Sequence, residues 1–162
     1  MTTSPPPRAW HVARWGPLGW TETGLKLAAA AVGVIAIIVA LQDPIDWAGP
    51  ARGAQVGILG ALAIGLTFAI ADRIIEREIV SMVVILILVA GHWCMVIALE
   101  ISGDVEALLA VFAGLMLVGE LVKLGFLANT DFRVRDLPRG LLFALTGIYA
   151  AGYLLLLLLI PL

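Results

Sequence analysis

The sequence predicts an all-α fold, a polytopic transmembrane bundle of five spanning helices with short loops. Hydrophobic residues make up 62% of the chain and charged residues only 14%, against roughly 45–50% and 25% in soluble domains. The hydrophobic residues also gather into five long runs. At about 1.5 Å rise per residue, each run can cross or nearly cross a hydrocarbon core of about 30 Å. We therefore expect one integral membrane domain over residues 1–162, with helices at about 25–41, 54–71, 79–99, 105–127 and 141–162.

The segment before the first run, residues 1–24, is predicted to be a cytoplasmic or interfacial arm. A regular helix over residues 4–20 is disfavoured because prolines interrupt this stretch. The arm contains three tryptophans, a residue type that is enriched at the level of the lipid headgroups: Trp10, Trp15 and Trp20. In the first helix, we expect Lys26 to extend its ammonium group to the membrane interface.

The basic residues predict the orientation of the bundle. All ten lysines and arginines except Arg52 lie in three places: before or at the start of the first helix, between the second and third helices, and around the end of the fourth helix. The last group includes Arg133, Arg135 and Arg139, which are candidates for contact with lipid headgroups. Because positively charged loops stay in the cytoplasm, we expect the N-terminus inside and the C-terminus outside a plasma or inner membrane.

The second predicted helix carries a small residue at every fourth position. These residues are Gly53, Gly57, Ala61, Gly65 and Ala69. A face of this kind lets another helix approach closely, because no bulky side chain separates the two backbones. The fifth helix has a shorter version at Gly147 and Ala151. We expect both faces to pack within the chain; packing against another subunit is the alternative.

Three ionisable side chains lie inside the predicted helices, away from the helix ends: His92 in the third, and Glu120 and Lys123 in the fourth. Such residues are costly in lipid and are functional candidates for that reason. Glu120 and Lys123 share a face at i,i+3, so we expect a structural ion pair, with a proton or ion pathway as the alternative. We expect His92 to form a hydrogen bond with a neighbouring helix.

The sequence predicts no metal site and no cofactor. Cys94 is the single cysteine, which excludes an intrachain disulfide and a cysteine-rich metal site. The only other histidine, His11, lies outside the predicted helices, so this chain cannot hold a haem between two of its own histidines within the membrane. The remaining alternative for His92 is ligation of a chlorin, or of a haem shared with another subunit, with Gly91 leaving room for the ring.

These patterns favour a non-catalytic accessory or structural subunit of a larger membrane complex. Hydrolase and nucleotide-binding motifs such as HExxH, GxSxG and the Walker loop are absent, so no catalytic residue is assigned and an enzyme is less favoured. The expected partners are the lipid bilayer and other membrane subunits or copies of this chain. A net charge of −2 without a basic stripe does not indicate nucleic-acid binding.

Two other functions remain open at this point. The first is a small oligomeric carrier or channel for ions, protons or solutes, whose polar path uses His92, Glu120 and Lys123. The second is a membrane enzyme that modifies lipids or isoprenoids.

Overall fold

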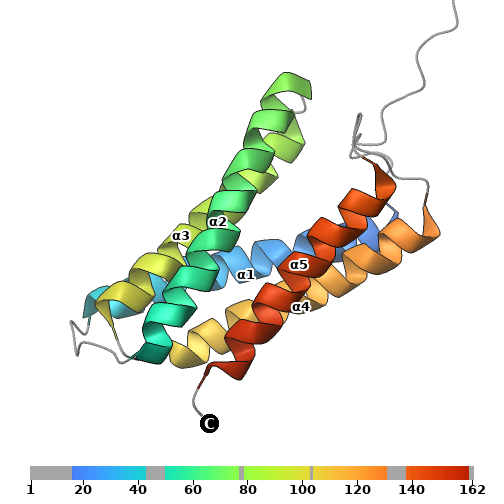
Figure 1. Cartoon of the computed structure of the whole chain (residues 1–162). Coiled ribbons are helices and arrows are strands. Elements are labelled where there is room, and N and C mark those ends of the chain that lie inside the picture. The colour runs from blue at the N-terminus through green and yellow to red at the C-terminus, as the bar shows by residue number, and fades with distance from the viewer. Residues whose placement is uncertain (1–15, 43–49, 77–78, 103, 131–137, 161–162) are drawn as a thin grey trace, which may run out of the picture.

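The computed structural model of the chain describes residues 16–42, 50–76, 79–102, 104–130 and 138–160 (Figure 1). Its elements are the helices α1 (Pro17–Gln42), α2 (Pro50–Glu76), α3 (Ile79–Ile101), α4 (Glu106–Asn129) and α5 (Arg139–Leu158). Among the described residues there is no strand, and all five helices contain a segment long and apolar enough to cross a membrane. The predicted bundle of five spanning helices is confirmed, and the chain is a multi-pass integral membrane protein.

Helix α1 begins at Pro17, well before the expected start at residue 25. A proline is tolerated in the first turn because the amide that it lacks would have no partner inside the helix. The amide of Trp20 donates to the carbonyl of Gly16 at 3.1 Å and closes this first turn. The end of the predicted arm is therefore helical, and Glu22 and Lys26 lie within α1. Trp20 is 53% exposed, and the other two tryptophans of the arm, Trp10 and Trp15, lie outside the described residues.

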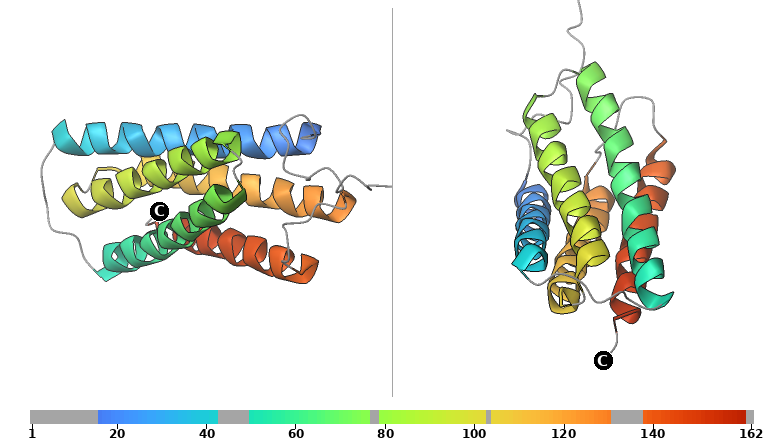
Figure 2. Two further views of the ribbon diagram at one scale, coloured as in Figure 1. Left: turned by 90° about the horizontal axis from the view of Figure 1, so that it is seen from above. Right: turned by 90° about the vertical axis from the view of Figure 1, so that its left-hand side faces the viewer.

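The five helices form a closed ring in the order α1, α3, α2, α5, α4 (Figure 2). Helix α1 packs against α3 and α4, α2 packs against α3, and α5 packs against α4 and, over the smallest of these contacts, against α2. The pair α2 and α3 diverges from the other three helices toward the end at which α2 stops and α3 starts (Figure 1). Large apolar side chains at the start of α3, including Ile79 and Val80, are accordingly exposed.

Small residues set the closest helix contact of the ring, the crossing of α1 and α3. Gly33 of α1 lies directly against the backbone of Gly91 of α3, and Gly91 lies against Ala30. The buried face of α1 continues this pattern through Ala36 and Ala40. Because lipid supplies no hydrophobic drive between helices, close backbone packing has to hold such a pair together.

Most of the small residues that were predicted to pack against another helix lie outside the helix contacts. On α2, Gly53, Gly57 and Ala61 are exposed, and no described atom would lie within 4 Å of a side chain added at either glycine. Of the three glycines, only Gly65 lies directly against another helix, at the hydroxyl of Tyr149 in α5. Ala69 is half-buried.

On α5 the position that packs differs from the two that the sequence indicates. Gly147 has no described atom within 4 Å of an added side chain, and Ala151 is exposed. Gly152 lies instead against the side chain of Leu62 in α2. The spacing of small residues therefore marks a helix face without saying whether that face turns inward.

We predict that Gly33→Ala destabilises the bundle by about 1–3 kcal/mol, the usual cost of overpacking. The added methyl group would meet the carbonyl of Gly91, a backbone group that cannot move aside. The matched control is Gly114→Ala in α4, where the added group meets no described atom within 4 Å and where alanine favours the helix by about 1 kcal/mol. Unfolding of the purified protein in detergent measures both variants, and equal stabilities would contradict the proposed crossing.

Candidate functional site

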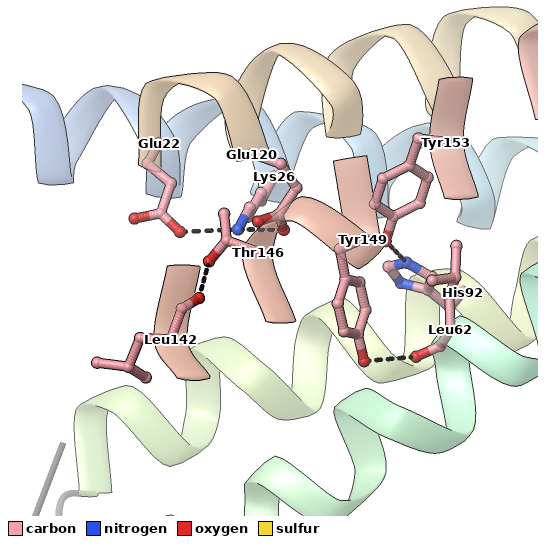
Figure 3. Close-up of polar contacts among 9 residues, drawn as sticks. All are labelled: Glu22, Lys26, Leu62, His92, Glu120, Leu142, Thr146, Tyr149 and Tyr153. Atoms are coloured by element: carbon pink, nitrogen blue, oxygen red, sulfur yellow. Dashed lines mark hydrogen bonds and ion pairs between the residues drawn. The ribbon is translucent and has the colours of Figure 1, made fainter. Parts of the chain in front are cut away.

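Polar side chains buried in the described part of the chain concentrate where α1, α3, α4 and α5 meet (Figure 3). Two groups stand out there. One is an ionic group of Glu22, Lys26 and Glu120, hereafter the triad, and the other is the pair of His92 and Tyr153. The polar or charged residues that are buried are Lys26, Gln55, Ser81, His92, Ser102, Glu120 and Thr146.

The triad joins α1 to α4 through a single ammonium group. The Nζ atom of Lys26 lies 2.7 Å from Oε1 of Glu120 and 2.7 Å from Oε1 of Glu22. Glu22 and Lys26 are one turn apart on α1, the i,i+4 spacing at which opposite charges meet on a helix. Lys26 and Glu120 are only 5% and 3% exposed, so their ion pair is fully inside the bundle.

A glycine next to Glu120 makes room for the lysine. Gly119 is buried on α4, and a side chain added there would approach the Cγ atom of Lys26 to 3.1 Å. The apolar stem of Lys26 therefore lies along the backbone of α4. This packing lets the ammonium group reach Glu120 without exposing the stem.

The position of Lys26 differs from the expectation that it extends to the interface. The expectation rested on a helix that starts at residue 25, whereas α1 starts at Pro17 and carries Lys26 more than two turns into the helix. Its distance to Glu120 makes Lys26 an ion-pair partner from another helix, which the sequence did not indicate. Lys123, the expected partner, is half-buried on α4. The i,i+4 spacing of Glu22 and Lys26 indicated that these two side chains could pair, but not that they meet Glu120 inside the bundle.

His92 forms hydrogen bonds through both ring nitrogens. Its Nδ1 atom is 2.7 Å from the carbonyl oxygen of Leu88, and its Nε2 atom is 2.6 Å from the hydroxyl of Tyr153 in α5. A carbonyl can only accept, so Nδ1 carries the proton and Nε2 accepts from the tyrosine. The imidazole also meets the ring of Phe112 in α4 edge-on, with centroids 4.9 Å apart. One side chain thus links three helices.

This geometry does not fit axial ligation of a chlorin or haem by His92. The lone pair of Nε2 is directed at Tyr153, and the other nitrogen is held by its own helix. Gly91 was expected to leave room for a ring, but Ala30 of α1 occupies the space beside it. Among the described residues no group of three or more histidine, cysteine or acidic side chains is arranged to hold a metal ion.

Two further hydrogen bonds attach α5 to α2. The hydroxyl of Tyr149 donates to the carbonyl of Leu62 at 3.1 Å, in the space left by Gly65. At the other end of the contact, the side-chain amide of Gln55 donates to the backbone carbonyl of Leu159 at 3.1 Å. Carbonyl groups at the end of a helix have no partner inside it, so Gln55 satisfies the end of α5. Neither residue was singled out by the sequence.

The arginines assigned to the headgroup region have different outcomes. Arg139 donates from Nη2 to the carbonyl of Leu127 at 2.5 Å, so it satisfies a carbonyl near the end of α4 while starting α5. Its guanidinium group also lies 5.8 Å from the ring centroid of Phe143. Arg133 and Arg135 lie outside the described residues.

Comparison of the chain with protein-family models, with curated proteins and with solved structures gives no match. In the described part of the chain the groups of the site bind to one another, and the triad is the one place where two carboxylates share one cation.

We predict that Lys26→Met is strongly destabilising, because it leaves Glu120 buried with no cation. Breaking a buried pair in this way costs about 3–5 kcal/mol. Glu120→Leu should cost less, since Lys26 keeps Glu22 as a partner. The double variant should regain part of the loss of Lys26→Met. A double-mutant cycle of unfolding free energies measures the coupling, and strictly additive effects would argue against the ion pair.

We predict that Tyr153→Phe lowers the free energy of unfolding by about 0.6 kcal/mol and by no more than about 1.7 kcal/mol, the average and the maximum found for hydrogen bonds between membrane helices. The change leaves Nε2 of His92 without its donor. Tyr149→Phe is the matched control and should cost less, because the carbonyl of Leu62 that it releases belongs to a helix and has a second partner. An equal or larger loss in the control would contradict the prediction that the bond between Tyr153 and His92 contributes more than the bond between Tyr149 and Leu62.

Proposed function

We propose that this protein is a non-catalytic structural subunit of a larger membrane assembly, and that α2 is the helix through which it docks. The observation that carries the proposal is the bare outer face of α2, where Gly53, Gly57 and Ala61 are exposed. The spanning segment of α2, residues 52–70, is also the least buried of the five, with 22% of its apolar stretch buried inside the protein.

Exposed glycines in a spanning helix need a reason. Glycine costs about 1 kcal/mol relative to alanine inside a helix, and a face that meets only lipid gains nothing in return. A face of small residues recovers this cost when another helix packs on it, because the backbones then approach closely. On α1 and α3 the same device is used within the chain, at Gly33 and Gly91.

The interior groups support a role in packing rather than catalysis. Glu120 is covered by Lys26, and His92 is engaged at both nitrogens. Neither is placed to act as an acid or base on a lipid or isoprenoid substrate, which weakens the case for a membrane enzyme. The ion pair and the hydrogen bonds are instead ties between helices.

A small oligomeric carrier or channel is the second candidate function, and the triad is the observation that favours it. One buried and one partly exposed carboxylate, with one ammonium group between them, could bind a cation or a proton in transit. In this case Lys26 and Glu120 form the polar path together with His92. We further propose that the N-terminus faces the cytoplasm of a plasma or inner membrane, in keeping with the distribution of arginine and lysine.

We predict that Gly57→Leu separates the protein from its assembly while the chain stays helical, since leucine blocks close approach at an exposed position. Native mass spectrometry after mild solubilisation should show the wild-type chain with other subunits at a fixed ratio. Recovery of that complex should fall at least tenfold in the variant, which corresponds to about 1.4 kcal/mol. The matched control is Ala28→Leu, at an exposed position of α1.

Other outcomes of the same experiment separate the two functions. A wild-type chain that runs as a monomer, or a complex that Gly57→Leu leaves intact, contradicts docking through α2. A complex made only of copies of this chain favours the carrier or channel.

A further inference from the structure

One oxygen of the triad lacks a partner. Oε1 of Glu120 is paired with Lys26, but Oε2 is buried and has no hydrogen-bond partner among the described residues. Glu120 as a whole is only 3% exposed. A buried carboxylate oxygen without a donor is costly, so this atom marks a position where the described structure leaves an interaction open.

The charges of the triad point to the same position. If all three groups are ionised, two carboxylates share one ammonium group, and the triad carries one negative charge in excess. A negative charge buried inside a protein or a membrane is expensive. One added proton makes the triad neutral while leaving Lys26 positively charged between its two partners.

The triad is open at one end. The side chain of Glu22 is 18% exposed, whereas those of Lys26 and Glu120 are 7% and 4% exposed. Glu22 also lies nearer the start of α1 than Lys26 does. The three groups thus form a short line from a partly exposed carboxylate to a buried one (Figure 3).

Other charged or titratable groups surround Glu120 from several helices. His92 and Tyr153 bond to each other, and the hydroxyl of Tyr149 donates to Leu62, so none of these three serves Oε2. Among the described residues these groups are Glu22 and Lys26 on α1, His92 on α3, Lys123 one turn after Glu120 on α4, and Tyr149 and Tyr153 on α5.

We propose that the triad takes up one proton from the side of the membrane at which α1 begins, and that Glu120 receives it. A proton from water first binds a carboxylate oxygen of Glu22. Lys26 then passes a proton from Nζ to Oε1 of Glu120 and takes the proton held by Glu22, so it remains an ammonium group. Rotation of the carboxyl group then exchanges its two oxygens. The unprotonated oxygen of Glu120 accepts a hydrogen bond from Lys26 again. This proposal does not depend on docking through α2.

Infrared spectroscopy of the full chain in phosphatidylcholine vesicles tests the proposal. As the pH is lowered, the carbonyl stretch of one protonated carboxylic acid should appear and should shift in deuterated water. The band should be lost in Glu120→Gln and kept in Glu100→Gln, which makes the same change at an exposed carboxylate.

Glu120→Asp is the control for loss of the band through misfolding. It keeps the acid, so the band should persist at a changed frequency, and circular dichroism should show the helices intact in every variant. The proposal is overturned if the same band remains in Glu120→Gln. It is equally overturned if no carboxylic acid band appears at any pH at which the wild-type chain is helical.

Discussion

The ion pair between Lys26 and Glu120 is the interaction on which the arrangement of α1 depends. Between the crossing with α3 and its own first turn, α1 packs mainly on α4, because α3 diverges from it there (Figure 1). Lipid gives no hydrophobic drive to hold two helices together. A charged hydrogen bond of 2.7 Å, with Gly119 bringing the backbones close, supplies the contact instead. Without Lys26, Glu120 would lose its ion-pair partner, whereas Lys26 without Glu120 would still have Glu22.

Two other bonds between helices also lie beside a small residue. Tyr149 reaches α2 where Gly65 leaves space. His92 reaches α5 through Tyr153 from a point beside Gly91, which packs on α1. Helix α2 has these ties on one face only. Its opposite face has no such bond to another described helix. We therefore propose that the small residues on that face pack against a partner outside the chain.

Hydropathy and charge were sufficient to predict five spanning helices, because crossing lipid requires long apolar helices whatever their neighbours. The partners of the buried groups were not predictable in the same way. Whether Glu120 meets Lys26 or Lys123 depends on which helix lies opposite, and hydropathy does not encode this. The stripe from Gly53 to Ala69 identified a face of α2 but not its direction. The start of α1 was missed because its first turns are polar, although Pro17 suits a helix start.

A structural and a chemical role for Glu120 are compatible in this arrangement. When Glu120 is neutral, its bare oxygen still accepts a hydrogen bond from Lys26, and Lys26 keeps its ion pair with Glu22 at 2.7 Å. The contact between α1 and α4 then changes from an ion pair to a hydrogen bond of a charged donor, which remains stronger than a neutral one. Glu22 is therefore more than a surface partner. Because it holds the charge of Lys26 in both states, the helices can stay packed while the charge of Glu120 changes.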